Sequence, residues 1–399
     1  MAASDLTSVA HIYKRRYSDK EVAEVASREH PTFAMIAKED GFNGSAFYYP
    51  IDYGWPQGVS GTFASAQSGA ASTKGVQLVA SRKAKYGVIT LNGEAMAAAR
   101  GNAGAFYDLV TKETDRILSE MGDSFAFDLF RDGNGIRGRR SSASSNTITL
   151  TDANDVRNFK VGMTIGSDNT ATGLSPNSGT TTVTAINEDG GTITLANAGA
   201  ISSFADNDYL FRAGDPGTCM EGFESCTPLT APVFASDSFR GIDRGADVYG
   251  LAGVRINDTT ASIIQNMGLA ATRAGFRGKK LKRGILNPVN FWTVSQLLGA
   301  KVEYEGGGGT AEVGFEYIVI NTPGGSVRVT SDPDCPTNRF RMFDPAAHYL
   351  KHLDGLPHIV KDDGRPSLRS AAADDIEVRA RGWVNYIQTD TAAHAVGAI

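Results

Sequence analysis

The chain has 399 residues, of which 41% are hydrophobic and 21% charged, and its formal net charge is −5. This is the composition of a folded globular protein with room for two or three domains, and the mild acidity argues against a dedicated nucleic-acid-binding protein. No uncharged apolar run approaches the ~20 residues that span a bilayer, and residues 1–5 show no secretory signal. Cys219, Cys226 and Cys335 form neither a disulfide framework nor a CxxC motif, so we predict reduced thiols in a cytosolic product.

Residues 1–40 are predicted to form a helical arm. Ser18 and Glu21 have the spacing of a capping box, and apolar residues follow them. The arm is also the most basic part of the chain, through His11, Lys14, Arg15 and Arg16. We favour a solvated or interface role for these charges over direct contact with DNA.

A long hairpin is predicted next. Residues 45–51 alternate and are rich in aromatic side chains, residues 53–75 are rich in Gly and Ser without an acidic residue, and residues 76–91 return with Arg82, Lys83 and Lys85 between apolar positions. Two arms of ~20 residues would reach roughly 60–65 Å at ~3.3 Å per residue. Such a hairpin is not stable alone in water, so it needs another surface to lie on.

One strongly amphipathic helix follows the hairpin. Apolar side chains recur with a period of 3.6 residues over residues 106–131, and charged side chains occupy the opposite face. At 1.5 Å per residue this helix would be roughly 39 Å long. Gly133 is a plausible C-terminal stop.

Residues 145–214 are predicted to form a small β-barrel or sandwich built from two similar halves and inserted into a host domain. The stretch Thr147–Leu150 recurs as Thr192–Leu195, and Phe159 recurs as Phe204, both at an offset of 45 residues. Each copy then enters a further strand, at residues 163–165 and 209–211. A β-branched run, residues 180–186, lies between the two copies.

The remainder of the chain is predicted to be mixed helix and strand. Residues 259–276 and 289–298 have helical patterns, and Asn287-Pro288 opens the second of these helices. A glycine run occupies residues 306–309. Strands are predicted at residues 315–320, 327–329, 340–343, 358–361, 376–382 and 384–388.

None of the motifs that suggest chemistry is persuasive. Residues 133–138 match GxGxxG, but they follow a helix rather than a strand, which favours a turn over a dinucleotide site. His348, His352 and His358 lack the intervening Glu of a zinc peptidase. The adjacent pairs at residues 362–363 and 374–375 suit turns, and no GxSxG elbow is present. We therefore predict no enzyme activity, no cofactor and no metal.

The order of these segments resembles the major capsid proteins of tailed bacteriophages, which share the Hong Kong 97-type fold. Residues 47–91 look like the extended loop of that family and residues 106–131 like its spine helix. The remaining likeness lies in three stretches: residues 239–253, residues 287–292 (Asn-Pro followed by aromatics), and the C-terminal pattern Asp344-Pro345, Pro357, Asp363-Gly364, Arg379 and Gly382.

The resemblance implies an α+β chain of the Hong Kong 97-type with an inserted small all-β domain. The segments that it implies are an N-terminal arm (1–44), an extended loop (45–92), a peripheral domain with the spine helix (93–144), the inserted domain (145–214), a peripheral return (215–250), an axial domain (251–340), and peripheral strands that return to the axial domain (341–399).

The resemblance also implies the function and the partners. Identical subunits would assemble through pentamers and hexamers into an icosahedral shell around phage double-stranded DNA, which they would contact weakly and without sequence specificity. The protein would be part of the virion and would assemble in the cytoplasm of the host bacterium. Further partners would be a separate scaffolding protein, a portal and in some cases a decoration protein, with no membrane involved.

The subunit contacts implied by the family pair the basic loop of one subunit with acidic side chains on the spine helix of the next. The basic residues would be Lys74, Arg82, Lys83 and Lys85, and the acidic ones Asp108, Glu113, Asp115 and Glu120. Some members of the family join subunits by a Lys–Asn isopeptide bond. No matching Asn and Glu can be placed here, so no cross-link is carried over.

Two alternative functions stay open. An encapsulin-type compartment shares the fold class and would co-purify with cargo enzymes, although the inserted module and the glycine-rich loop favour a virus. A carbohydrate-binding or adhesin-like protein would show clustered surface aromatics on the Thr-rich module. The aromatic residues there have a spacing that suits its core: Phe159, Phe204, Tyr209 and Phe211.

Overall fold

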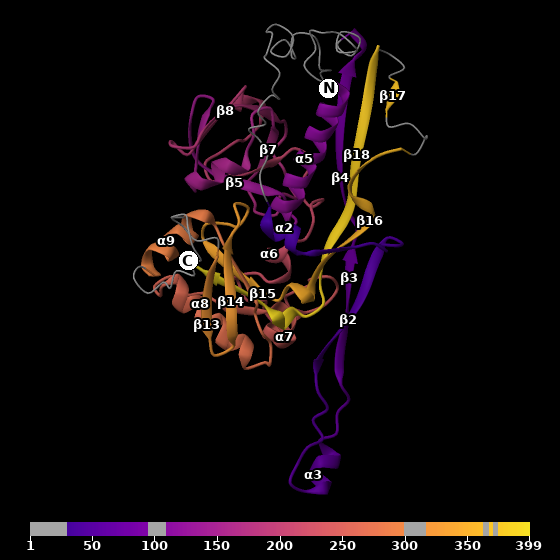
Figure 1. Cartoon of the computed structure of the whole chain (residues 1–399), viewed down its shortest axis with the longest axis vertical. Coiled ribbons are helices and arrows are strands. Elements are labelled where there is room, and N and C mark those ends of the chain that lie inside the picture. Colours follow the sequence, from indigo (N-terminus) through magenta and orange to yellow (C-terminus); the bar gives the residue numbers. More distant parts are fainter. Residues whose placement is uncertain (1–29, 95–108, 299–316, 362–366, 370–373) are drawn as a thin grey trace, which may run out of the picture.

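The computed structural model describes residues 30–94, 109–298, 317–361, 367–369 and 374–399. Figure 1 shows four parts: a long sheet with a helix along it, a closed barrel beside that helix, a six-stranded sheet with its own helices, and a hairpin that projects away from all three. The mixture of helix and strand agrees with the α+β prediction. The predicted N-terminal helix, Asp108, the glycine run 306–309 and the pair 362–363 lie outside the described residues.

The projecting hairpin consists of β2 (Ala46–Gly54) and β3 (Lys74–Ser81), paired antiparallel, with the short helix α3 (Phe63–Ser68) at its tip. The prediction of a hairpin is confirmed, but the predicted length of its return arm is wrong. After Arg82 the chain continues as β4 (Lys83–Asn92), which pairs with the C-terminal strand β18 instead of with the first arm.

The long sheet contains β1 (Ala37–Glu39), β16 (His348–Ile359), β18 (Asp375–Gln388) and β17 (Leu368–Arg369), with β4 on the other edge of β18. Residues 376–388, predicted as two strands, form one continuous strand, and the predicted strand at residue 358 is the end of β16. Along this sheet runs α5 (Leu109–Leu129), whose 21 residues span roughly 32 Å. Its face towards the sheet is buried as predicted over the second half of the helix, at Met121, Phe125 and Leu129.

The six-stranded sheet has the order β11 (Val254–Ile256), β19 (His394–Ala398), β15 (Arg339–Phe343), β12 (Arg283–Leu286), β14 (Gly325–Ser331) and β13 (Ile318–Thr322). The predicted helices are present as α8 (Ile263–Gly275) and α9 (Pro288–Leu298). A capping box between Ser262 and Gln265 begins α8, and Met267 packs into the sheet's core. Strands β11, β12 and β19 were not predicted.

The barrel is closed and six-stranded, in the order β10 (Tyr209–Arg212), β5 (Ile136–Ser144), β6 (Thr147–Leu150), β9 (Thr192–Leu195), β8 (Thr181–Asn187) and β7 (Thr164–Asp168). The 45-residue repeat has a structural basis, because it relates the starts of β5 and β8, of β6 and β9, and of β7 and β10. Exchanging the strands of each pair leaves every strand with the same neighbours around the barrel. The two halves are therefore related by a pseudo-twofold axis. Strand β5, which precedes residue 145, was missed.

Short helices join these parts. They are α2 (Pro31–Met35), α6 (Phe223–Cys226) and α7 (Val248–Ala252), together with the 3-10 turns η1 (Ala153–Asn158), η2 (Ala198–Ala200), η3 (Arg244–Asp247), η5 (Pro345–Ala347) and η6 (Thr391–Ala393). Turns η1 and η2 are themselves 45 residues apart, so the repeat extends through the connections of the barrel as well as its strands.

Candidate assembly surfaces

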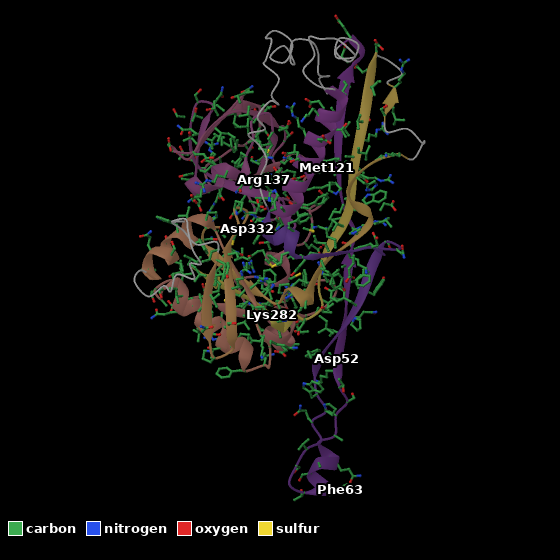
Figure 2. The ribbon with its side chains drawn as sticks, viewed as in Figure 1. Asp52, Phe63, Met121, Arg137, Lys282 and Asp332 are labelled. Atoms are coloured by element: carbon green, nitrogen blue, oxygen red, sulfur yellow. The ribbon has the colours of Figure 1, made fainter. Side chains whose placement is uncertain are left out.

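The tip of the hairpin is an exposed apolar surface without charge. Residues 53–73 contain no Asp, Glu, Lys, Arg or His. Three large side chains stand in solvent there: Trp55 is 83% exposed, Val59 89% and Phe63 83%. Figure 2 shows Phe63 at the far end of the projection, away from the body of the molecule. We call these three residues the tip trio. Large exposed apolar side chains gathered at one place mark an interaction surface.

The base of the hairpin, by contrast, is anchored. Tyr49, Ile51 and Leu78 are buried in a cluster with Ile242 and Leu251. The apolar side chains of the base therefore have partners within the chain, whereas those of the tip trio are left in water.

A buried arginine holds the base of the hairpin in its direction. The Arg240 guanidinium donates to the Tyr49 hydroxyl at 2.7 Å, to the Tyr386 carbonyl at 2.8 Å and to the Glu221 carboxylate at 2.9 Å. The Arg240 carbonyl accepts from the backbone N–H of Val79 in β3 at 3.1 Å. These bonds connect both strands of the hairpin to the body, so the hairpin leaves the body at a set angle.

Two of the basic residues expected on the loop, Lys83 and Lys85, have partners within their own chain. Lys85 Nζ lies 2.6 Å from the Asp128 carboxylate and 3.9 Å from that of Asp215. Burial raises the pKa of Asp128. Burial alone would lower the pKa of Lys85, but the charges of Asp128 and its other anionic neighbours together outweigh burial and raise that pKa. Lys83 Nζ donates to the Gly217 carbonyl at 3.0 Å. Both lysines belong to β4 in the body, so the projecting hairpin does not carry them.

Two of the acidic residues expected on the helix, Glu113 and Glu120, also have partners within the chain. Glu120 and Asp123 bind Lys160 of the barrel, each at 2.5 Å, and Glu120 also pairs with Arg212, which connects α5 to the barrel. Glu113 pairs with Arg116 at 2.7 Å, while Asp115 is exposed. Of the remaining basic residues, Lys74 is exposed, and Arg82 lies over the Trp383 ring at 5.4 Å. The structure contains one chain, so the expected contacts between subunits stay a prediction.

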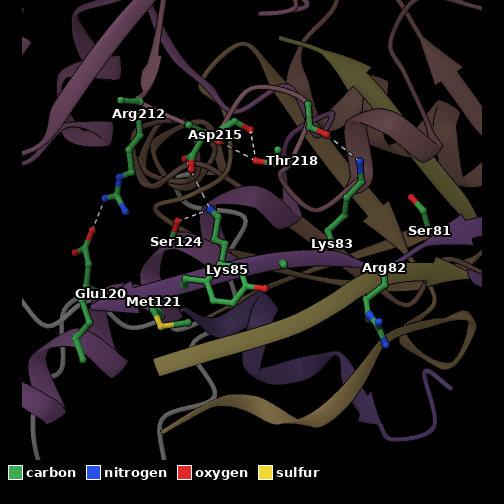
Figure 3. A pocket seen from close by; sticks show the side chains of 17 residues that line it. Ser81, Arg82, Lys83, Lys85, Glu120, Met121, Ser124, Arg212, Asp215 and Thr218 are labelled. Atoms are coloured by element: carbon green, nitrogen blue, oxygen red, sulfur yellow. Dashed lines mark hydrogen bonds and ion pairs between the residues drawn. The ribbon is translucent and has the colours of Figure 1, made fainter. Parts of the chain in front are cut away.

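A groove of about 640 Å³ lies between β4, α5 and the loop after β10. Figure 3 shows its lining, in which charged side chains meet across the groove: Lys85 faces Ser124 and Asp215, and Arg212 faces Glu120. Paired charges of this kind join elements of the fold. They do not make the nucleophile-and-base arrangement that covalent catalysis requires.

The histidines that suggested a metal site are placed separately. His348 is buried against Tyr386, whose hydroxyl bonds its Nδ1, and burial lowers the pKa of His348 to about 3. His352 faces Asp40 at 3.0 Å, and His358 faces Arg381. Across the part of the chain that the structure describes, no three His, Cys, Asp or Glu side chains come together as metal ligands. Within the same residues, no helix has the length and apolar character needed to cross a membrane.

His30 ties the start of the described chain to the body and predicts a pH dependence of stability. Its ring lies 2.8 Å from Asp123 and 2.5 Å from Asp334. Burial alone would lower the pKa of His30, but the hydrogen bonds to both carboxylates raise it from 6.5 to about 9. The stabilisation is therefore fully present below pH 6.5 and is lost as the pH rises through 9.

We expect the difference in unfolding free energy between the wild type and His30→Gln to shrink by about 1–3 kcal/mol between pH 6.5 and 9.5. Urea unfolding at the two pH values measures it. A difference that stays constant over this range would show that His30 is not a charged tie in the folded protein.

The fold matches that of known capsid subunits. A search of solved structures finds the cyanophage A-1(L) capsid asymmetric unit at a TM-score of 0.60 and 9% identity, covering 96% of this chain and 95% of that one. The capsid of an empty GTA particle matches at a TM-score of 0.50 and 11% identity, covering 100% and 99%. No family model and no curated protein matches the sequence. The chain thus has the fold of these capsid subunits, as the sequence resemblance led us to expect.

The sequence prediction missed the residues that the structure brings forward. The tip trio was not predicted, because the glycine-rich tip was interpreted only as a loop, although its 21 residues without charge were a visible signal. Arg240, Asp128 and His30 carry no local signal. Most of their partners lie 43 or more residues away along the chain, and no spacing in the sequence reveals such pairs.

Proposed function

We propose that this protein is a phage major capsid protein that assembles through pentamers and hexamers into an icosahedral shell around double-stranded DNA. One observation carries the proposal. The body has the fold of capsid subunits, and a hairpin that is anchored to it at the base projects from it and exposes Trp55, Val59 and Phe63 at its tip. A soluble monomer gains nothing from that surface. A subunit that reaches a neighbour gains a contact at every copy of the tip.

The energetics of the tip suit repeated assembly. Full burial of one large apolar side chain contributes about 1.5–3 kcal/mol. Three such side chains per hairpin give a contact on the order of 5 kcal/mol, which is too weak to hold two free subunits against the cost of association. In a closed ring each subunit binds one neighbour with its own tip and is bound by the tip of the other neighbour. Such heterologous contacts generate a closed ring when the rotation between subunits is right. A shell would thus be stable as a whole while single contacts stay reversible.

The remaining assignments follow from the same proposal. The protein belongs to the virion and assembles in the cytoplasm of the host bacterium, with a separate scaffolding protein, a portal and in some phages a decoration protein as partners. The barrel is an inserted domain between α5 and the rest of the body, with β5 added at its start. The extended loop ends near Arg82, because β4 belongs to the long sheet, and the other segment boundaries stay as predicted from the sequence. Contact with DNA is weak and depends on phosphates, so it falls with salt.

Nuclease protection tests the proposed cargo. Shells purified from the source and treated with DNase should retain genome-length double-stranded DNA that is released on denaturation. Shells that protect no DNA and instead contain a defined enzyme would overturn the viral function in favour of an encapsulin-type compartment.

A further inference from the structure

The barrel carries an uncharged hollow on its surface. The hollow has a volume of about 440 Å³, which lies in the range of pockets that bind ligands. Phe211 and Leu174 supply its largest apolar side chains, and Leu174 is 72% exposed. No residue of the lining is charged: Gly166, Gly173, Leu174, Pro176, Asn177, Gly179, Thr180, Phe211, Ala213, Gly214 and Pro216.

Glycines give the hollow its shape. Gly179 has a φ of +93°, and a Cβ there would lie 2.0 Å from the Ala200 carbonyl oxygen. At Gly166 a Cβ would lie 2.8 Å from the Phe211 ring. The chain therefore approaches its neighbours more closely at these points than any larger residue permits, and larger side chains do not fill the space.

Buried carboxylates hold the loop that forms the rim. Asp168 accepts from the backbone N–H groups of Thr170 at 2.7 Å and Ser175 at 2.8 Å. Asp208 accepts from the Asn177 amide at 2.9 Å. Both aspartates are buried in the barrel, so the rim is fixed from inside. The hollow is accordingly a formed feature of the barrel, with little freedom to collapse.

We propose that the hollow receives the hairpin tip of a second copy of this chain, an inference that rests on the proposed function. Both surfaces are uncharged: the tip over residues 53–73 and the hollow over its whole lining. The tip offers Trp55 and Phe63, and the hollow offers a concave apolar site of the right scale for an aromatic side chain. Figure 1 places α3 and the barrel towards opposite ends of the longest axis, so a tip cannot reach its own barrel.

The groove beside α5 fits the tip less well, although it is larger. Its lining includes Arg82, Lys83, Lys85, Glu120, Arg212 and Asp215. An uncharged tip laid over these side chains would remove water from them and offer no opposite charge in return, which is costly. The apolar hollow presents no such cost. The tip is therefore expected to bind the barrel of the neighbour and not the acidic face of its helix, where the family likeness placed the loop.

Engineered cysteines test this pairing in the full chain. The native cysteines are all buried, so exposed cysteines will react selectively. Ala64→Cys places a thiol next to Phe63 on the tip, and Ser178→Cys places one between two residues that line the hollow. Ser119→Cys places a thiol at a matched exposed position on α5 and serves as the control. Capsomers or shells of the Ala64→Cys, Ser178→Cys variant should form disulfide-linked ladders on mild oxidation, whereas Ala64→Cys with Ser119→Cys should not.

A charge placed at the hollow gives a second readout. Thr180→Arg should lower the yield of shells at least tenfold, the loss expected when a central apolar contact of an interface is disrupted. Ser119→Arg, the matched change on α5, should leave the yield unchanged. Ladders through Ser119→Cys, or no ladder in oligomers that do form, would overturn the inference and leave the proposed function standing. A chain that forms no oligomer even with lysate from its source would count against the proposed function itself.

Discussion

Replacing residues 55–73 with Asn-Gly should abolish shells and leave the subunit folded. Gly54 and Lys74 lie opposite each other in the hairpin, so a two-residue turn closes the shortened strands. The residues removed include the tip trio, which makes no contribution to the buried core. The melting temperature should therefore stay within ~2 °C of the wild type, because removal of exposed residues costs little.

Light scattering and calorimetry together measure this outcome. Phe63→Ser should reproduce much of the loss of shells as a single change, and Gln67→Ala, on the same exposed tip helix, should have no effect. Full-size particles from the Asn-Gly variant would contradict the role assigned to the hairpin. A large fall in melting temperature would show instead that the tip supports the body.

Lys85→Met should destabilise the folded subunit by about 3–5 kcal/mol, since it leaves the buried Asp128 carboxylate without its partner. The double variant Lys85→Met, Asp128→Leu should recover most of this loss, because an apolar pair of similar volume often replaces a buried ion pair without cost. Lys83→Met is the matched control on the same strand. Its contact with Glu221 is 3.7 Å long and partly exposed, so its loss should cost less than ~1 kcal/mol.

Urea unfolding at neutral pH measures all three variants. A Lys85→Met protein within 1 kcal/mol of the wild type would mean that the pair does not hold β4 against α5. If Lys85 instead served mainly as a contact between subunits, its replacement would reduce the yield of shells while the free subunit kept its stability. The two measurements thus separate the intramolecular role seen here from the intermolecular role expected from the sequence.

Periodicity predicted the elements that are regular over many residues. The core face of α5 follows the 3.6-residue pattern through Met121, Phe125 and Leu129, and the 45-residue repeat predicted two similar halves of a β module. The repeat was seen only in β6, β9 and their following strands. Strands β5 and β8 occupy equivalent places without similar residues, so the first strand of the barrel was assigned to the preceding segment.

Strand pairing was the part that the sequence could not predict. Residues 76–91 read as one return arm, but β3 pairs with β2 while β4 pairs with β18, almost 300 residues further along. That pairing brings Lys85 opposite Gly382 and directs its side chain at α5. A basic residue on an alternating strand looks exposed from its neighbours alone. Whether it is buried depends on which strand lies beside it.

Electron microscopy of the purified chain, with and without lysate from its source, tests the central claim most directly. The proposal that this chain builds a shell predicts closed, uniform particles of tens of nanometres in at least the lysate sample, and their loss in the Asn-Gly variant. A chain that stays a homogeneous monomer under both conditions would contradict it.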